Sequence, residues 1–249
     1  MQLTHEARLP PDRVQSYHPT TMPHPLRPPI RRAWLAGPMA LVIGLVLAVT
    51  DVAPALATPA QMQPGKVLPD STEQVISVAA IQALTALNEF VNKGNQDDFD
   101  LYRVFADRLA VPVAVALDLN VRELQRSWAS ADLSRQQAII AGLTQLGVPY
   151  RLYTSIPFKS FDCSGLTSYA WGIAGIDIAR GSRAQFYGAT PIKADKAQLG
   201  DLVWRPGHVA MYLGVPGAVL QAPTEGRSVE IQLMNERIAG WVRYANPLA

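Results

Sequence analysis

The sequence predicts an α+β fold in which helices come first and short strands follow. Apolar residues recur every three or four positions up to about residue 146, which is typical of amphipathic helices. After Gly175 they gather into short runs bounded by turn residues, which is typical of strands. Between the two parts, a loop turns into a helix at Cys163, the only cysteine of the 249 residues. Helices followed by strands favour an antiparallel sheet.

Residues 1–57 are predicted to be an export leader. A basic, proline-rich stretch (1–33) precedes an apolar run (34–49) and small residues near position 57, which is the pattern of a secretory signal. The run is shorter than the roughly 18 apolar residues that comfortably span a bilayer, so we expect cleavage and a secreted product. The alternative is an uncleaved anchor, which would be the chain's only membrane contact. Residues 58–70 are predicted to be a linker.

The composition after the leader narrows the functional classes. Seventeen Lys and Arg are balanced by seventeen Asp and Glu, so nothing predicts a nucleic-acid partner. His208 is the one histidine here, and one histidine with one cysteine cannot form a closed zinc site without several carboxylates. We therefore expect no metal and no cofactor. Exported proteins usually spend cysteines on disulfides, so the unpaired Cys163 is a reactive group, a link between chains, or a buried inert side chain.

A small helical domain is predicted over residues 71–131. Apolar residues at helical spacing continue until Gly94 ends the first helix. A second helix is expected over about 99–110, Pro112 is expected to open a third, and Asn120 to cap a fourth. Helical periodicity by itself indicates no catalytic role, so this domain is expected to be a packing or spacer module.

The second domain is predicted over residues 132–249. Another amphipathic helix ends at GVPY (147–150), and a loop then leads to the helix of Cys163. Because side chains alternate along a strand, His208 is expected on the face opposite Val209 and Met211, which point to the core. Strands are expected at 202–204, 209–213, 218–220, 229–231 and 241–244.

Cys163 and His208 have the features of a thiol hydrolase. A free cysteine has a pKa of about 8.5, and a helix N-terminus with a neighbouring imidazolium can lower it. The small residues Ser164 and Gly165 would leave backbone N–H groups accessible to an oxyanion. His208 would take the thiol proton and return it to the leaving amine.

Six motifs follow one another in the second domain. They are GVPY (147–150), DCSGL (162–166), SRAQ (182–185), GDLV (200–203), HVAMYLG (208–214) and QAP (221–223). In kind and order they resemble the NlpC-type peptidoglycan endopeptidases, a family of cysteine peptidases with a papain-like fold. The resemblance implies a catalytic cysteine at a helix N-terminus, packed on an antiparallel sheet.

The resemblance also implies roles for individual residues. Cys163 would be the nucleophile, His208 the base and Gln221 the residue that orients His208. Tyr150 and the backbone N–H of Cys163 would support the oxyanion. The implied substrates are stem peptides of bacterial peptidoglycan, commonly cut between γ-D-glutamate and diaminopimelate, without metal or cofactor, on the cell-wall side of the membrane. The residues that would contact substrate are Tyr150, Asp162, Ser164, Ser182 and Arg183.

Two departures from the family pattern leave alternatives open. Gln221 stands where the family more often has histidine, and a neutral amide cannot stabilise an imidazolium by charge. Residues 151–154 replace a Trp-Gly-Gly segment of the cleft wall. The alternatives to an endopeptidase are a catalytically weak wall-binding or scaffold protein, and an amidase or acyltransferase on the same fold.

The helical domain directly precedes the catalytic loop, and two roles for it are open. As an inhibitory lid it would cover the cleft, and as a spacer it would position the enzyme at the wall. A lid predicts that residues 132–249 are more active than residues 58–249.

Overall fold

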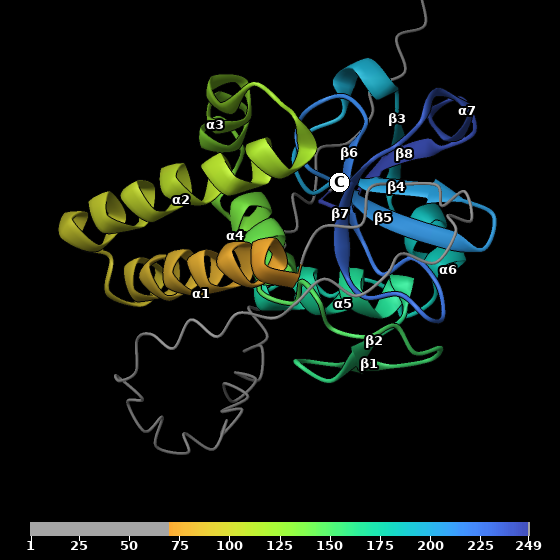
Figure 1. The fold of residues 1–249 in the computed structure, drawn as a ribbon, viewed down its shortest axis with the longest axis horizontal. Helices are drawn as coiled ribbons and strands as arrows, with labels where there is room; N and C mark the ends of the chain where they lie inside the picture. The colour runs from red at the N-terminus through yellow and green to blue at the C-terminus, as the bar shows by residue number, and fades with distance from the viewer. Residues whose placement is uncertain (1–69, 249) are drawn as a thin grey trace, which may run out of the picture. The chain divides into compact units, whose positions relative to one another are not determined.

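The computed structural model describes residues 70–248, so the expected leader and nearly all of the expected linker lie outside the described residues. The predicted α+β class is confirmed (Figure 1). The helices are α1 (Asp70–Lys93), α2 (Gln96–Leu117), α3 (Val121–Ala129), α4 (Leu133–Leu143), α5 (Cys163–Ile173), α6 (Ser182–Tyr187), α7 (Glu236–Ala239) and the 3-10 turn η1 (Ala194–Lys196). The strands are β1 (Ser155–Ile156), β2 (Ser160–Phe161), β3 (Thr190–Ile192), β4 (Leu202–Arg205), β5 (His208–Tyr212), β6 (Ala218–Gln221), β7 (Glu230–Leu233) and β8 (Arg243–Asn246).

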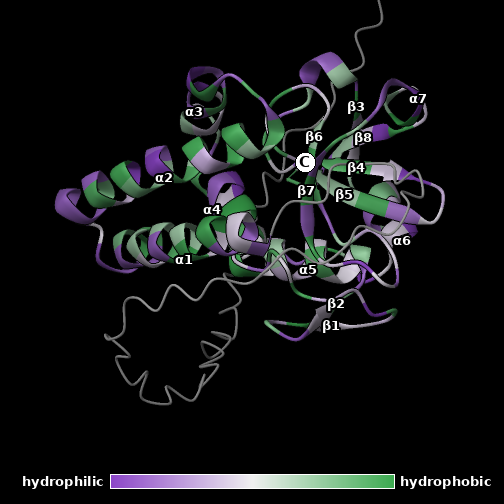
Figure 2. Ribbon diagram, in the orientation of Figure 1, coloured by the Kyte–Doolittle hydropathy of each residue, from purple (hydrophilic) through white to green (hydrophobic). Residues whose placement is uncertain are grey.

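Helices α1 and α2 lie side by side as an antiparallel pair (Figure 1). Gly94 turns the chain with φ +70°, and the Asn95 side chain caps α2 by accepting the Asp98 backbone N–H at 2.8 Å. Asn120 caps α3 as predicted, by accepting the Glu123 N–H at 3.0 Å. Bands of hydrophobic and hydrophilic residues alternate along both long helices (Figure 2), which is the pattern of helices with one buried face.

The expectation that Pro112 opens a separate helix is wrong, because α2 runs through Pro112 to Leu117. A proline inside a helix costs about 3 kcal/mol through its missing N–H and its ring. Leu109 and Val113 on either side are fully buried, and burying such side chains contributes roughly 1.5–3 kcal/mol each. Core packing therefore outweighs the local penalty and keeps the helix continuous.

The six-stranded sheet is antiparallel throughout, in the order β3-β8-β4-β5-β6-β7. The predicted strands are present with shifted ends, whereas the short strands β1, β2 and β3 were not predicted. The alternation expected along β5 is confirmed: Val209 and Met211 belong to the main core, on the face covered by α5. Ala210 and Tyr212 belong to a small second cluster on the other face. His208 therefore opens onto that second face.

One continuous apolar core joins α1–α4 to the sheet. At the end of β5 remote from His208, the Trp128 indole N–H donates to the Leu213 carbonyl at 2.9 Å, and Ser127 Oγ donates to the Gly214 carbonyl at 2.6 Å. The helical segment is therefore fastened to the far end of the strand that carries His208. The division near residue 131 stays a prediction.

Helix α1 is, among the helices of residues 70–248, the one long and apolar enough to pass for a membrane span. Core helices meet the same criterion. Its residues Ile76, Ala80, Ala83 and Leu87 are fully buried in the shared core, so one face of α1 is already occupied by the protein.

Candidate active site

Cys163 is the first residue of α5, and the helix start is fixed by the residues beside it. The Asp162 side chain caps α5, with Oδ1 accepting the Gly165 backbone N–H at 2.6 Å. The Thr154 carbonyl lies so close that a Cβ on residue 165 would be 2.1 Å from its oxygen. Only glycine fits there, and this explains why a glycine follows the Cys-Ser pair.

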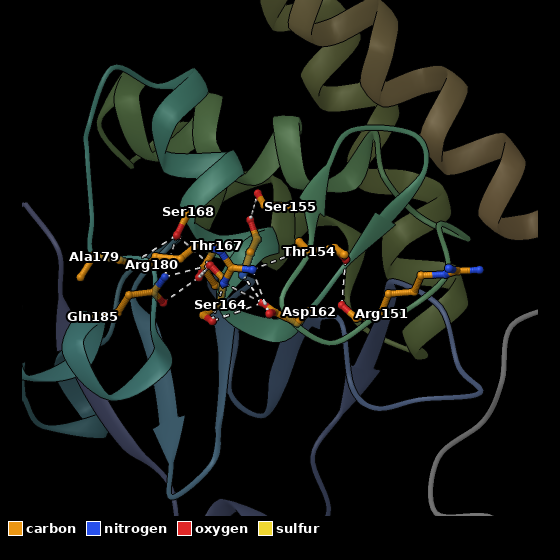
Figure 3. Close-up of polar contacts among 11 residues, drawn as sticks. Arg151, Thr154, Ser155, Asp162, Ser164, Thr167, Ser168, Ala179, Arg180 and Gln185 are labelled. Atoms are coloured by element: carbon orange, nitrogen blue, oxygen red, sulfur yellow. Dashed lines mark hydrogen bonds and ion pairs between the residues drawn. The ribbon is translucent and has the colours of Figure 1, made fainter.

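Arg180 clamps this helix start from the next loop (Figure 3). Its Nη1 donates to Asp162 Oδ1 at 2.9 Å and to Ser164 Oγ at 3.0 Å. Its Nη2 donates to Asp162 Oδ2 at 2.9 Å and to the Thr154 carbonyl at 3.0 Å. The fork geometry of a guanidinium suits such a two-oxygen contact with a carboxylate. Arg180 therefore ties the cysteine loop, α5 and the loop before α6 into one rigid unit.

Gln185 in the SRAQ motif fastens α6 to α5 (Figure 3). Its Nε2 donates to the Ser164 carbonyl and to Ser168 Oγ, both at 2.9 Å, and its Oε1 accepts from Thr167 Oγ1 at 2.7 Å. Gln185 is buried, and these three hydrogen bonds of its side chain all go to residues of α5. The role of this motif glutamine is thus to hold the helix that carries Cys163.

His208 begins β5 and is oriented from the neighbouring strands. Its Nε2 lies 2.8 Å from Oε1 of Gln221, the last residue of β6. Gln221 Nε2 donates in turn to Glu230 Oε1 at 3.0 Å and Gln232 Oε1 at 2.7 Å, both on β7. With Nε2 engaged by Gln221, Nδ1 is the ring nitrogen left for another partner. The backbone N–H of Val209 donates a hydrogen bond to Cys163 Sγ. The thiol therefore lies against the residue next to His208.

Burial favours the neutral forms of both Cys163 and His208. Burial raises the pKa of the Cys163 thiol, and the Asp162 charge adds to this, although hydrogen bonds from Val209 and Ser164 oppose it. Burial also lowers the pKa of His208 to about 4, against the hydrogen bond to Gln221 and with help from the Arg205 charge. The expectation of a lowered thiol pKa is therefore not met in the free protein, because desolvation outweighs the helix terminus. Both shifts favour a neutral thiol and a neutral imidazole in the free protein.

Cys163 and His208 each line a separate depression. The thiol cleft is lined by Cys163 together with Tyr150, Asp162, Ser164, Arg180 and Ser182. The imidazole pocket is lined by His208 together with Arg205, Val219, Gln221, Arg227 and Gln232. Among the described residues, those lining either depression all lie between 150 and 242, so the helical segment contributes none.

Not all of the site residues predicted from the sequence lie at the thiol cleft. Tyr150, Asp162, Ser164 and Ser182 surround Cys163 in the thiol cleft, whereas Arg183 is exposed and lies over the Tyr187 ring at 5.5 Å from its centroid. The arginine that lines the cleft is Arg180, which was not predicted because it stands outside the recognised motifs. Glu230 and Gln232 were missed as well, since only sheet pairing brings them to Gln221.

The GDLV motif has a structural role. Asp201 is fully buried, and its Oδ1 accepts from Arg135 Nη1 of α4 at 2.7 Å. Arg135 also donates to the Leu199 carbonyl and to Asn246. Within residues 70–248, no group of three or more His, Cys, Asp or Glu side chains is placed to hold a metal ion.

Comparison with known proteins adds three findings. The NlpC/P60 family model matches residues 147–243. A probable endopeptidase of Corynebacterium glutamicum (strain R) is 32% identical over 171 residues, covering 68% of this chain and 76% of the relative. The peptidoglycan endopeptidase RipB of Mycobacterium tuberculosis is 29% identical over 227 residues, covering 82% and 90%. A solved structure of RipB is 22% identical, with a TM-score of 0.42 and coverage of 70% and 84%.

Proposed function

This chain belongs to the NlpC/P60 family and is homologous to its peptidoglycan endopeptidases, and we propose that it hydrolyses stem peptides of bacterial peptidoglycan. We propose the bond from γ-D-glutamate to diaminopimelate as the one cleaved. The observation that carries the proposal is the capped helix start at Cys163, whose thiol accepts a hydrogen bond from the backbone of Val209, the residue after His208, while Gln221 holds the imidazole of His208. We propose that the chain acts outside the cytoplasm, where peptidoglycan lies, in keeping with the proposed export leader.

In the proposed reaction, Cys163 attacks the peptide carbonyl as a thiolate formed only when substrate is present. His208 accepts the thiol proton on Nδ1 while its Nε2–H stays bonded to Gln221 Oε1. Burial favours the neutral forms of both groups, so the thiol proton is passed to His208 as general base when substrate is present. Backbone N–H groups at the start of α5 and Tyr150 then stabilise the oxyanion.

The second half of the proposed reaction releases both products. His208 returns its proton to the leaving amine, and the acyl group remains on Cys163 as a thioester. Water, deprotonated by His208, then attacks the thioester and frees the carboxylate product and the thiol. No other proton donor is needed in either half.

Substrate contacts are proposed for the residues that surround the thiol. Tyr150, Asp162, Ser164 and Ser182 all line the thiol cleft. The Asp162 carboxylate is already held by Arg180, so it offers a fixed acceptor to an amine or amide of the peptide. Arg183 stays a proposed contact that depends on a substrate long enough to reach the outer surface of α6.

The decisive experiment compares wild type with Cys163→Ala on defined tripeptide and tetrapeptide muropeptides, followed by mass spectrometry. Wild type is expected to yield new fragments whose masses identify the bond, and Cys163→Ala to yield none while keeping its melting temperature within a few degrees. Cys163 is buried without a covalent partner, so its truncation leaves the fold intact. Binding of intact peptide by wild type without any turnover would favour the wall-binding alternative, and a different bond would favour an amidase or acyltransferase.

For the helical segment, we propose a spacer rather than a lid. The described residues that line the thiol cleft and the imidazole pocket include none from this segment. Its bonds to the sheet are made at the end of β5 away from His208. Greater activity of residues 132–249 than of residues 58–249 would instead support the role of an inhibitory lid.

A further inference from the structure

Gln221 is held between two different kinds of partner. Its Oε1 lies 2.8 Å from His208 Nε2, and its Nε2 donates to Glu230 Oε1 at 3.0 Å and to Gln232 Oε1 at 2.7 Å. The two ends of an amide have nearly the same shape, so only its partners decide which end faces the histidine. An ionised carboxylate can only accept hydrogen bonds. Turning the amide over would set the Gln221 oxygen against the Glu230 carboxylate.

We propose that Glu230 is a positioning residue of the catalytic site, which keeps the Gln221 oxygen turned towards His208 and so selects the imidazole tautomer protonated on Nε2. That tautomer leaves Nδ1 unprotonated, and Nδ1 is the atom that must take the thiol proton. The inference rests on the proposed function for its kinetic consequence. The tautomer itself follows from the hydrogen bonds alone.

Glu230 is firmly placed for this task. It is the direct cross-strand partner of Gln221 in the pairing of β6 with β7, and it is 7% exposed. Arg227 Nη2 donates to its second oxygen, Oε2, at 2.5 Å. The Arg227 charge favours the carboxylate against the burial that raises the pKa of Glu230. One oxygen is thus fixed by Arg227 and the other is left to Gln221.

The arrangement also accounts for an amide in the third position. A carboxylate can only accept from the imidazole N–H, whereas an amide presents either a donor or an acceptor and needs a fixed acceptor behind it. Glu230 supplies that acceptor, and Arg227 connects it to the cleft, since the Arg227 carbonyl accepts the Tyr150 backbone N–H at 2.8 Å. Gln221 and Glu230, on adjacent strands, thus act together on the imidazole.

The kinetic test compares the full-length chain with two test variants and one control variant. Glu230→Gln replaces the obligate acceptor by an amide that can present either end, so Gln221 is free to turn over. We expect kcat on stem tripeptide to fall on the order of ten- to hundredfold, with KM close to wild type. The double variant Gln221→Glu with Glu230→Gln sets a carboxylate against His208 and an amide behind it, and is expected to regain most of the loss. Glu236→Gln, an exposed acid on α7, is the matched control and is expected to leave kcat unchanged.

A spectroscopic test separates positioning from a merely structural role. In the ¹⁵N-histidine spectrum of the full-length chain, the His208 signals are identified by their loss in His208→Ala. At pH 7 the ring is neutral, because burial lowers the pKa of His208 to about 4. We expect one tautomer, protonated on Nε2, in wild type and in the double variant, and a mixture in Glu230→Gln.

The possible outcomes distinguish the proposed role of Glu230 from the proposed hydrolase function. A Glu230→Gln variant that keeps both kcat and the Nε2–H tautomer overturns the inference, and so does a loss of kcat that the double variant does not restore and that leaves the tautomer unchanged. If wild type cleaves no muropeptide but Glu230→Gln still mixes the tautomers, the inference stands and the proposed function fails.

Discussion

The thiol side and the imidazole side of the site are held in place by different kinds of contact. Asp162 caps the helix start through Gly165, three residues later, and Cys163 lies between them. On the imidazole side, the ring depends on Gln221 and Glu230, which come from two further strands. The thiol side is therefore set by a local helix cap that Arg180 reinforces from the next loop, whereas the placement of the imidazole side depends on the register of the sheet.

Gly165→Ala is expected to have the largest effect, because residue 165 is where the start of α5 closely approaches the Thr154 backbone. The added Cβ would lie 2.1 Å from the Thr154 carbonyl oxygen, which is backbone and cannot swing aside. We expect a loss of about 3 kcal/mol in the free energy of unfolding and a more than roughly hundredfold lower rate on muropeptides. Urea unfolding and initial rates measure the two effects.

Gly172→Ala is the matched control in the same helix. A Cβ there meets nothing within 4 Å. Because alanine is the better helix former, this variant is expected to gain about 0.5–1 kcal/mol and to keep wild-type activity. Equal behaviour of the two variants would show that the close approach of Thr154 does not matter.

The imidazole side is expected to weaken in acid through His208 itself. In the folded protein the pKa of His208 is about 4, below the value of 6.5 for an exposed histidine. Between these values the unfolded chain binds the extra proton, so stability is present above about pH 6.5 and is lost as the pH falls towards 4. The loss amounts to roughly 3 kcal/mol. Comparing urea unfolding of wild type and His208→Gln at pH 7.5 and 4 isolates it from the carboxyl groups, which both proteins share. A constant difference between the two proteins would contradict a buried neutral His208.

The contrast between the sides also decides what the sequence could predict. The DCSGL motif is contiguous, so its residues could be named from the sequence, and alternation along one strand was enough to orient His208. The pairing of Gln221 with Glu230 is a matter of sheet register, which no motif encodes. Pro112 was misjudged for a related reason, since the burial of its neighbours depends on helices distant in the sequence.

Arg180 was not predicted, because nothing in the sequence distinguishes a single arginine in a loop from an exposed surface charge. Arg183, three residues later, stands inside a recognised motif, yet it lies over Tyr187 on the outside of α6. The motif therefore marks where α6 attaches, through Gln185, more than where a cation meets the cleft. The arginine inside the motif and the arginine that lines the cleft are thus different residues, with Arg180 in the loop before α6 and Arg183 within the helix.

The smallest expected effect separates these two arginines. Arg180→Met removes four hydrogen bonds to Asp162, Ser164 and Thr154, while the cap from Asp162 to Gly165 remains. We therefore expect the thiol side to loosen without unfolding and kcat/KM on muropeptides to fall by about ten- to hundredfold. Arg183→Met removes an exposed charge stacked on one ring, and is expected to change kcat/KM by less than about threefold. If Arg183→Met has the greater effect, Arg183 binds substrate outside the thiol cleft, and the rigidity of the cysteine loop matters less than the contacts of Arg180 imply.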